Sequence, residues 1–234
     1  MSTSYIDRPR TAEQDCPPGT RVTKSLLGYG VLAGPLYVIV VLAQAVLRPG
    51  FSLAHDDASL LSNGSLGWIQ IANFLVTGAM VIASAIGMRR ALTGGRSALW
   101  GPVLIGVYGL GLIAAGIFVA DPMNGFPPGT AAGKPAVITT HGMLHIAAAG
   151  IGFLCLVTAC FVFARRFARE RRRGWMWFSL ATGIAFLGAF VGVASGSDSL
   201  LILLAFWAAL ILAWAWIGAL SVRLYRQMSS QTTE

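Results

Sequence analysis

Three histidines and a few aspartates are the residues of this 234-residue chain that could carry chemistry. His141 and His145 are four residues apart, so on a helix they would lie about 40° apart around the axis and roughly 6 Å apart along it. Two imidazoles with this spacing can bind one metal ion, and a third ligand would complete a catalytic site with an open water position. Asp121, which ends the third apolar span, is the candidate third ligand, because the Pro- and Gly-rich stretch after it returns the chain to His141 and should make the two helix ends neighbours.

The other polar candidates would complete a hydrolytic site. Asp57 is the candidate general base, His55 a further binding residue, and Asn73 a hydrogen-bond donor behind the ligands. With zinc or another divalent ion, the chemistry would be metal-assisted hydrolysis. The ion lowers the pKa of bound water to about 7, and a carboxylate takes up the proton as hydroxide attacks a carbonyl or phosphoryl centre.

The same pattern has a structural alternative, which is its commoner role. Histidines at i and i+4 near a helix end often donate hydrogen bonds to loop carbonyls, and Asp57 could cap a short helical turn. Asp121 stands before Pro122, and an aspartate before proline frequently initiates a turn. Without the glutamate of a zinc-protease motif, the two histidines are a pattern of low specificity. A metal site, a structural polar cluster and another ligand or proton role therefore stay open.

The elements that must position these residues are long apolar segments. The chain is 56% hydrophobic and 11% charged, whereas soluble domains are about 25% charged. Six segments contain no Asp, Glu, Lys or Arg, and each is long enough to cross a bilayer of roughly 30 Å. These segments are residues 25–47, 67–88, 99–120, 138–163, 175–195 and 200–222. The sequence predicts an all-α, polytopic integral membrane protein that forms a six-helix transmembrane bundle.

The basic residues predict the orientation of this bundle. Fifteen of the 17 Lys and Arg residues fall in alternate connections and in both tails. The positive-inside rule then places the N and C termini in the cytoplasm of a bacterial cell and the three other connections outside. We therefore expect a multi-pass protein of the cytoplasmic membrane whose histidines and nearby aspartates face outward.

The chain divides into three parts by composition. Residues 1–24, rich in Pro and mixed charges, predict a disordered cytoplasmic arm. Residues 25–224 predict the six-span membrane domain, and residues 225–234 a cytoplasmic tail. Anionic lipid headgroups are the expected partners of a basic cluster, and nucleic acid is not. This cluster consists of Arg165, Arg166, Arg169, Arg171, Arg172 and Arg173.

Glycines predict where helices approach closely. Gly188, Gly192 and Gly196 recur every four residues, a spacing that lets a neighbouring backbone come near. This spacing favours a central position for the fifth span. We expect a polar pocket that opens outward between the second, third and fourth spans.

Three short motifs occur in order along the chain: Ser59-Leu60-Leu61-Ser62-Asn63-Gly64 before Gly67-Trp68, Phe118-Val119-Ala120-Asp121-Pro122 with Gly125-Phe126-Pro127, and His141-Gly142-Met143-Leu144-His145. In these motifs the chain resembles the bacterial membrane-protein family catalogued as domain of unknown function 998, over roughly residues 26–224. The resemblance implies a six-helix membrane protein with no established activity. It also implies that Asp121, His141 and His145 belong to the polar motif of the family. A looser similarity to alkaline ceramidases and adiponectin receptors, which have seven spans, is an analogy of chemistry only.

These observations predict a membrane protein of unassigned molecular function with an outward-facing His/Asp cluster. One alternative is a metal-dependent hydrolase that acts on an amphiphilic or lipid-like substrate at the outer face. A second alternative is a small-molecule carrier. The sequence predicts neither the ligand nor the oligomeric state.

Overall fold

The computed structural model describes residues 18–197 and 199–230, and this part of the chain is all-helical. Six of its helices are long and apolar enough to cross a membrane, which confirms the predicted fold class. They are α1 (Pro18–Leu47), α2 (Gly67–Ala91), α3 (Ser97–Ile117), α4 (Thr140–Arg169), α5 (Arg173–Ala194) and α6 (Leu200–Ser230). A short 3₁₀ helix, η1 (Ala58–Ser62), precedes α2.

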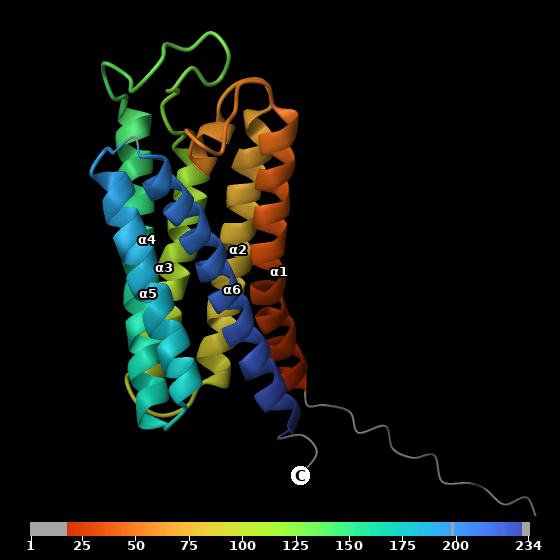
Figure 1. Ribbon diagram of the computed structural model, residues 1–234. Coiled ribbons are helices and arrows are strands. Elements are labelled where there is room, and N and C mark those ends of the chain that lie inside the picture. Colours follow the sequence, from red (N-terminus) through yellow and green to blue (C-terminus); the bar gives the residue numbers. More distant parts are fainter. Residues whose placement is uncertain (1–17, 198, 231–234) are drawn as a thin grey trace, which may run out of the picture.

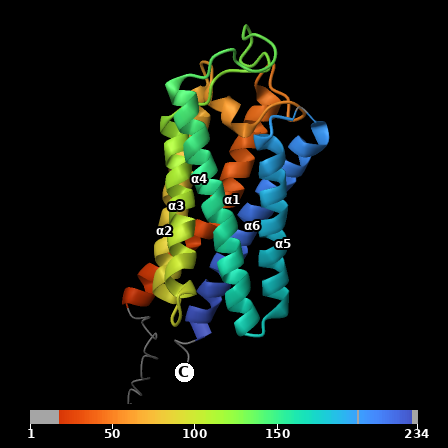
Figure 2. The same cartoon turned by 90° about the vertical axis from the view of Figure 1, so that its left-hand side faces the viewer.

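The six long helices form a closed ring. Each packs against the next along the chain, and α6 returns to pack against α1 (Figures 1 and 2). We call the end that carries η1 and the long connection between α3 and α4 the loop end. The opposite end, where α1 begins and α6 ends, is the terminal end (Figure 1). Consecutive helices run antiparallel, which gives an up-and-down arrangement.

Several helices extend beyond the predicted spans. α1 begins at Pro18 rather than at residue 25, and α6 continues to Ser230 rather than ending at residue 222. The prediction stopped each span at the first charge, but Lys and Arg are good helix formers that can continue a helix beyond the apolar layer. Residues 18–24 of the predicted arm are therefore helical, whereas residues 1–17 lie outside the described part of the chain.

α2 and α3 approach each other closely through their glycines. A Cβ atom added at Gly109 would lie 2.9 Å from the backbone oxygen of Gly78, so these two helices nearly touch through their backbones. Of the predicted α5 glycines, Gly188 has open space, since a Cβ atom there would meet nothing within 4 Å, whereas a Cβ atom at Gly192 would lie 2.8 Å from the side chain of Ile202 on α6. α5 packs against α4 and α6 and is a member of the ring, so the predicted central position of the fifth span is wrong. Glycine spacing alone does not say which face of a helix has a neighbour.

Large side chains fill the ring at the terminal end. Trp216 of α6 is fully buried, and its indole N–H donates to Ser179 Oγ of α5 over 2.9 Å. Phe163 of α4 packs edge-on against Trp216, with ring centroids 5.7 Å apart. Ser84 of α2 is hydrogen-bonded to Ser221 of α6 at 3.1 Å. The interior of the bundle is therefore packed in this half.

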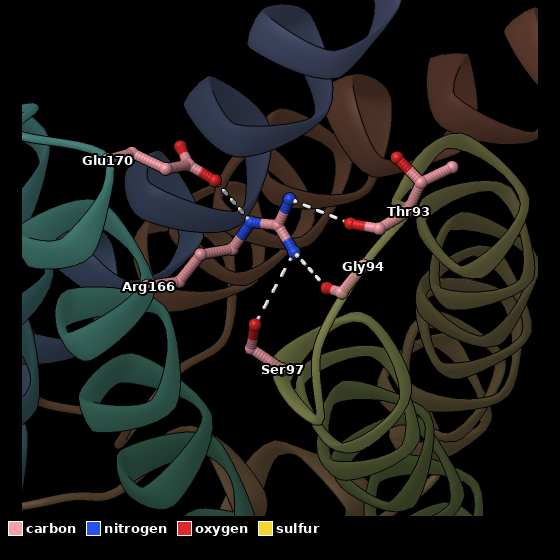
Figure 3. Close-up of polar contacts among 5 residues, drawn as sticks. All are labelled: Thr93, Gly94, Ser97, Arg166 and Glu170. Carbon is pink, nitrogen blue, oxygen red and sulfur yellow. Dashed lines mark hydrogen bonds and ion pairs between the residues drawn. The ribbon is translucent and has the colours of Figure 1, made fainter.

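Arg166 ties the connection between α2 and α3 to α4. Its guanidinium donates to the backbone oxygens of Thr93 and Gly94 over 3.2 and 3.3 Å, and to Ser97 Oγ over 3.4 Å (Figure 3). It also forms an ion pair with Glu170, one turn along the same helix, at 2.7 Å. One residue of the predicted lipid-binding cluster is therefore engaged within the protein.

Arg48 organises the loop end in a comparable way. Its guanidinium donates to the backbone oxygens of Leu61 and Asn63 and lies 4.8 Å from the centre of the Phe126 ring. The Asn63 amide donates to the backbone oxygen of Ala120 over 3.1 Å. These contacts join the connection between α1 and α2 to the connection between α3 and α4, and the two connections form one ordered cap.

Candidate functional site

A cavity of about 620 Å³ lies inside the ring at the loop end. Its lining residues come from all six helices, from η1 and from the connection between α3 and α4. They lie in the loop-end half of each helix, from Tyr37 on α1 to Leu210 on α6. The predicted pocket lay between the second, third and fourth spans, whereas the structure extends it to α5 and α6.

Aromatic side chains form much of the cavity wall. Phe153 of α4 lies at the centre of this group and is 5.3 Å from Phe190 of α5 and 5.9 Å from Phe206 of α6, as measured between ring centroids. Tyr108 of α3 lies 6.3 Å from Phe153 on the other side. Trp207 also lines the cavity, and its buried indole N–H has no hydrogen-bond partner among the described residues. The wall is therefore largely apolar and rigid.

Asp57 is the acidic residue of the first connection that lines the cavity. It directly precedes η1, but its side chain makes no capping hydrogen bond, so the predicted capping role is not observed. The carboxylate atom Oδ1 is buried without a partner among the described residues. Burial, together with the smaller effect of the neighbouring Asp56 charge, raises the pKa of Asp57 to about 6. Asp57 therefore can change its charge near neutral pH.

Asp56 differs from Asp57 in its hydrogen bonding and its position, although its Oδ1 is also buried without a partner among the described residues. It is 1% exposed, its Oδ2 accepts a hydrogen bond from the backbone N–H of Ser52 over 2.7 Å, and it does not line the cavity. Burial is also the main cause that raises the pKa of Asp56. Asp56 thus holds the connection together, whereas Asp57 borders the cavity.

His145 lines the cavity and is oriented by the end of α3. Its Nδ1 lies 2.8 Å from the backbone oxygen of Phe118 and 3.2 Å from that of Ala115. Because carbonyl oxygens only accept hydrogen bonds, Nδ1 must carry the proton. In the neutral ring Nε2 then has the lone pair and can accept a hydrogen bond or a proton. The structural alternative predicts a contact with loop carbonyls, whereas the acceptors here belong to the last turn and the C-cap of α3.

Asp121 stabilises the start of α4. Its two carboxylate oxygens accept hydrogen bonds from the backbone N–H and the hydroxyl of Thr139, over 2.9 and 2.6 Å. Thr139 in turn caps the helix by accepting from the N–H of Gly142 over 3.0 Å. A Cβ atom at Gly142 would collide with the Asp121 carboxylate. The end of α3 and the start of α4 are therefore neighbours, as the sequence predicts.

The remaining predicted site residues lie outside the cavity wall. His141 is exposed, and its ring packs edge-on against Phe118 at 5.9 Å. His55 is exposed and contacts Ser52 Oγ through Nδ1. Asn73 is buried between α1 and α2, where its amide donates to the backbone oxygen of Tyr37 and to Gln70. None of these three residues lines the cavity, so they do not join Asp57 and His145 there.

The described residues contain no group of three or more His, Cys, Asp or Glu side chains that could hold a metal ion. Asp121, His141 and His145 therefore do not form the predicted ligand set in this structure. The reason is local: Asp121 is engaged by Thr139, His145 Nδ1 is turned to α3 carbonyls, and His141 lies on the exposed side of α4. The structure gives no support for a zinc or other divalent ion at this place.

The cavity residues that sequence reasoning missed are mostly aromatic. Phe153, Phe190, Phe206 and Trp207 lie in the predicted spans, where aromatic residues are expected whether or not they face a cavity. Lys134, on the connection between α3 and α4, also lines the cavity, and its ammonium group donates to the backbone oxygen of Gly196. Lys134 is one of only two Lys or Arg residues in the three connections predicted to lie outside. This rarity could have marked it as a candidate site residue.

Comparison with known proteins gives one finding. A family model described as a protein of unknown function (DUF998) matches residues 31–223, which is most of the chain. This region includes all three motifs on which the resemblance rests. No curated protein and no solved structure matches the chain.

Proposed function

The chain belongs to the DUF998 family of unknown function, and we propose that it binds an amphiphilic small molecule in the cavity at the loop end of its helical bundle. The observation that carries this proposal is the cavity itself: about 620 Å³ of space within otherwise closely packed helices. Ligand sites typically have 300–1,000 Å³ of volume, apolar walls and a few convergent polar groups. Here the aromatic wall would contact the apolar part of the ligand, and Asp57 and His145 would contact its polar part.

The proposed orientation places this cavity at the non-cytoplasmic side. Within residues 18–197 and 199–230, Arg48 and Lys134 are the basic residues of the loop end, and the other Lys and Arg residues lie toward the terminal end. The positive-inside rule then assigns the terminal end to the cytoplasm. An amphiphile would reach the cavity from the outer leaflet or from the space beyond it.

Binding is better supported than either of the more specific alternatives. A metal-dependent hydrolase would need ligands that the described side chains do not bring together. A carrier would need a route through the bundle, and Trp216 and Phe163 fill the interior at the terminal end. We therefore propose binding of the amphiphile without a chemical step.

A pair of glycine substitutions tests the proposal. Gly150 lines the cavity, and a Cβ atom there would meet only the far end of the Phe190 ring, at 3.9 Å. Gly150→Leu should fill part of the cavity and weaken binding of a dodecyl amphiphile about tenfold or more, as measured by native mass spectrometry of the purified protein. Gly188→Leu adds the same side chain to an exposed face of α5 and serves as the matched control. Equal binding by the two variants would contradict the proposal.

We further propose that the terminal end contacts anionic lipid headgroups. Five residues of the predicted basic cluster are exposed around the end of α4 and the start of α5: Arg165, Arg169, Arg171, Arg172 and Arg173. Exposed basic residues near a membrane surface each contribute about 1 kcal/mol of attraction to anionic lipids. Arg166 is excluded from this set because its guanidinium is engaged by the connection between α2 and α3.

A further inference from the structure

Asp57 is an acidic group in an unusual position. It lines a largely aromatic cavity, one of its carboxylate oxygens is buried without a partner, and the structure shows no ion pair to it among the described residues. A buried carboxylate is normally paired with a cation or with several hydrogen-bond donors, because otherwise the loss of hydration is uncompensated. A bound ligand is therefore suited to supply the positive charge that would pair with the Asp57 carboxylate.

The basic residues near the cavity are already engaged elsewhere. Arg48 donates to the backbone oxygens of Leu61 and Asn63, and Lys134 donates to the backbone oxygen of Gly196. Neither contact brings a cation to Asp57. The other acidic residue of the wall, Asp121, receives two hydrogen bonds from Thr139. Asp57 is thus the carboxylate of the wall that the protein leaves without compensation.

The aromatic wall suits the same kind of ligand. Tyr37, Phe74, Tyr108 and Phe153 line the cavity together with Asp57. The faces of aromatic rings attract cations, and quaternary ammonium groups in particular are bound by clusters of such rings. A carboxylate without a protein partner, in a cavity lined by several aromatic rings, is the arrangement expected for an organic cation and not for an anionic or neutral headgroup.

Building on the proposed function, we infer that the ligand is a cationic amphiphile, whose substituted ammonium group is paired with the Asp57 carboxylate while its alkyl or aryl part lies along the aromatic wall. The inference names a ligand class and not a particular molecule. It requires no chemical step, because the interaction is an ion pair.

The ion pair should be sensitive to pH. Because the pKa of Asp57 is raised to about 6, protonation competes with the ligand below that value, and affinity for a permanent cation should fall about tenfold for each further pH unit. Other titratable groups also face the cavity or adjoin Asp57, and protonation of His145 would add a repulsive charge. These groups are Tyr37, Asp56, Tyr108, Asp121, Lys134 and His145.

The test compares two probes of equal chain length. Dodecyltrimethylammonium carries a permanent positive charge, and N,N-dimethyldodecanamide is neutral. Binding of each to the purified full-length protein in a non-ionic detergent is measured by native mass spectrometry at pH 7.5 and pH 5. We expect the wild type to prefer the cation about tenfold at pH 7.5 and to lose most of this preference at pH 5.

Two variants, each of which replaces one carboxylate by an amide, separate the effect of the Asp57 charge from that of the neighbouring Asp56 charge. Asp57→Asn removes the charge with little change in size and should abolish the preference and its pH dependence. Asp56→Asn removes the adjacent charge, which does not line the cavity, and should keep the preference. Equal affinity of the wild type for both probes, or a preference that survives in Asp57→Asn, would overturn the inference.

The glycine variants distinguish this failure from failure of the proposed function. If Gly150→Leu weakens both probes while the wild type does not discriminate between them, the cavity binds amphiphiles but Asp57 does not select cations. If Gly150→Leu and Gly188→Leu bind both probes as the wild type does, the cavity is not the binding site and both proposals are wrong.

Discussion

At the scale of single residues, Asp57 makes the stability of the protein depend on pH. Its pKa is raised from the ordinary value of 3.8 to about 6 by burial and by Asp56. A carboxyl group with a raised pKa in the folded state contributes stability that is present below its unfolded pKa and is lost as pH rises through its folded pKa. The wild type should therefore lose stability between about pH 4 and pH 6.

Asp57→Asn should remove this loss. We expect the variant to be more stable than the wild type by about 1–3 kcal/mol at pH 7.5, since one pKa unit corresponds to about 1.4 kcal/mol. The difference should shrink to near zero at pH 4, where the wild-type carboxyl is also neutral. Thermal unfolding in detergent across this pH range measures it. A variant less stable than the wild type at pH 7.5 would show that the carboxylate is satisfied in the folded protein.

The two histidines of α4 show what residue spacing can and cannot predict. The order of the spans correctly places Asp121 beside the start of α4, because the connection that follows Asp121 returns the chain there. It does not predict that the ring of His145 turns its Nδ1 to the carbonyls of Phe118 and Ala115, or that His141 is exposed beside Phe118. Ring orientation depends on the free acceptors at the end of α3, which no helical periodicity reveals.

At the scale of elements, the contact between α2 and α3 depends on glycine. Gly109→Ala would place a Cβ atom 2.9 Å from the backbone oxygen of Gly78, so the helices must separate. Gly106→Ala is the matched control on the same helix, because its Cβ would make an ordinary contact of 3.7 Å with Ala85. We expect the first change to destabilise the protein by about 1–3 kcal/mol, and the second to be neutral or to stabilise it by up to about 1 kcal/mol. Thermal unfolding of both variants measures the difference, and equal stability would contradict the observed helix contact.

The sequence largely predicts the six membrane-spanning helices, but it does not predict which face of each helix turns toward the cavity. Six charge-free segments predict six spans because burying a charge in a bilayer is costly, and this part of the prediction is confirmed. Which face of α5 and α6 turns inward depends on packing with distant segments. The sequence could therefore suggest Asp57 and His145 as site residues, but not that Phe190 and Phe206 would form a wall with them.

At the scale of the whole molecule, the two ends of the bundle differ in packing. Trp216 and Phe163 fill the terminal end, whereas the loop end encloses the cavity under a cap held by Arg48 and Asn63. The family motifs lie in this cap and at the start of α4, apart from Gly67 and Trp68, which begin α2. The motifs that contain the predicted site residues therefore contribute to the cap and the wall of the cavity.

The side of the membrane on which this cap lies can be measured directly. We expect the loop end to be outside. Among the described residues, this end has the two basic residues Arg48 and Lys134, whereas the other Lys and Arg residues lie toward the terminal end. Single cysteines at Ala132 and Thr93, both exposed and at opposite ends, are introduced after the native cysteines are replaced by serine. In intact bacterial cells, a membrane-impermeant maleimide should label Ala132→Cys, and label Thr93→Cys only after permeabilisation. The reverse pattern would place the cavity on the cytoplasmic side, and its amphiphile would then have to come from the inner leaflet or the cytosol.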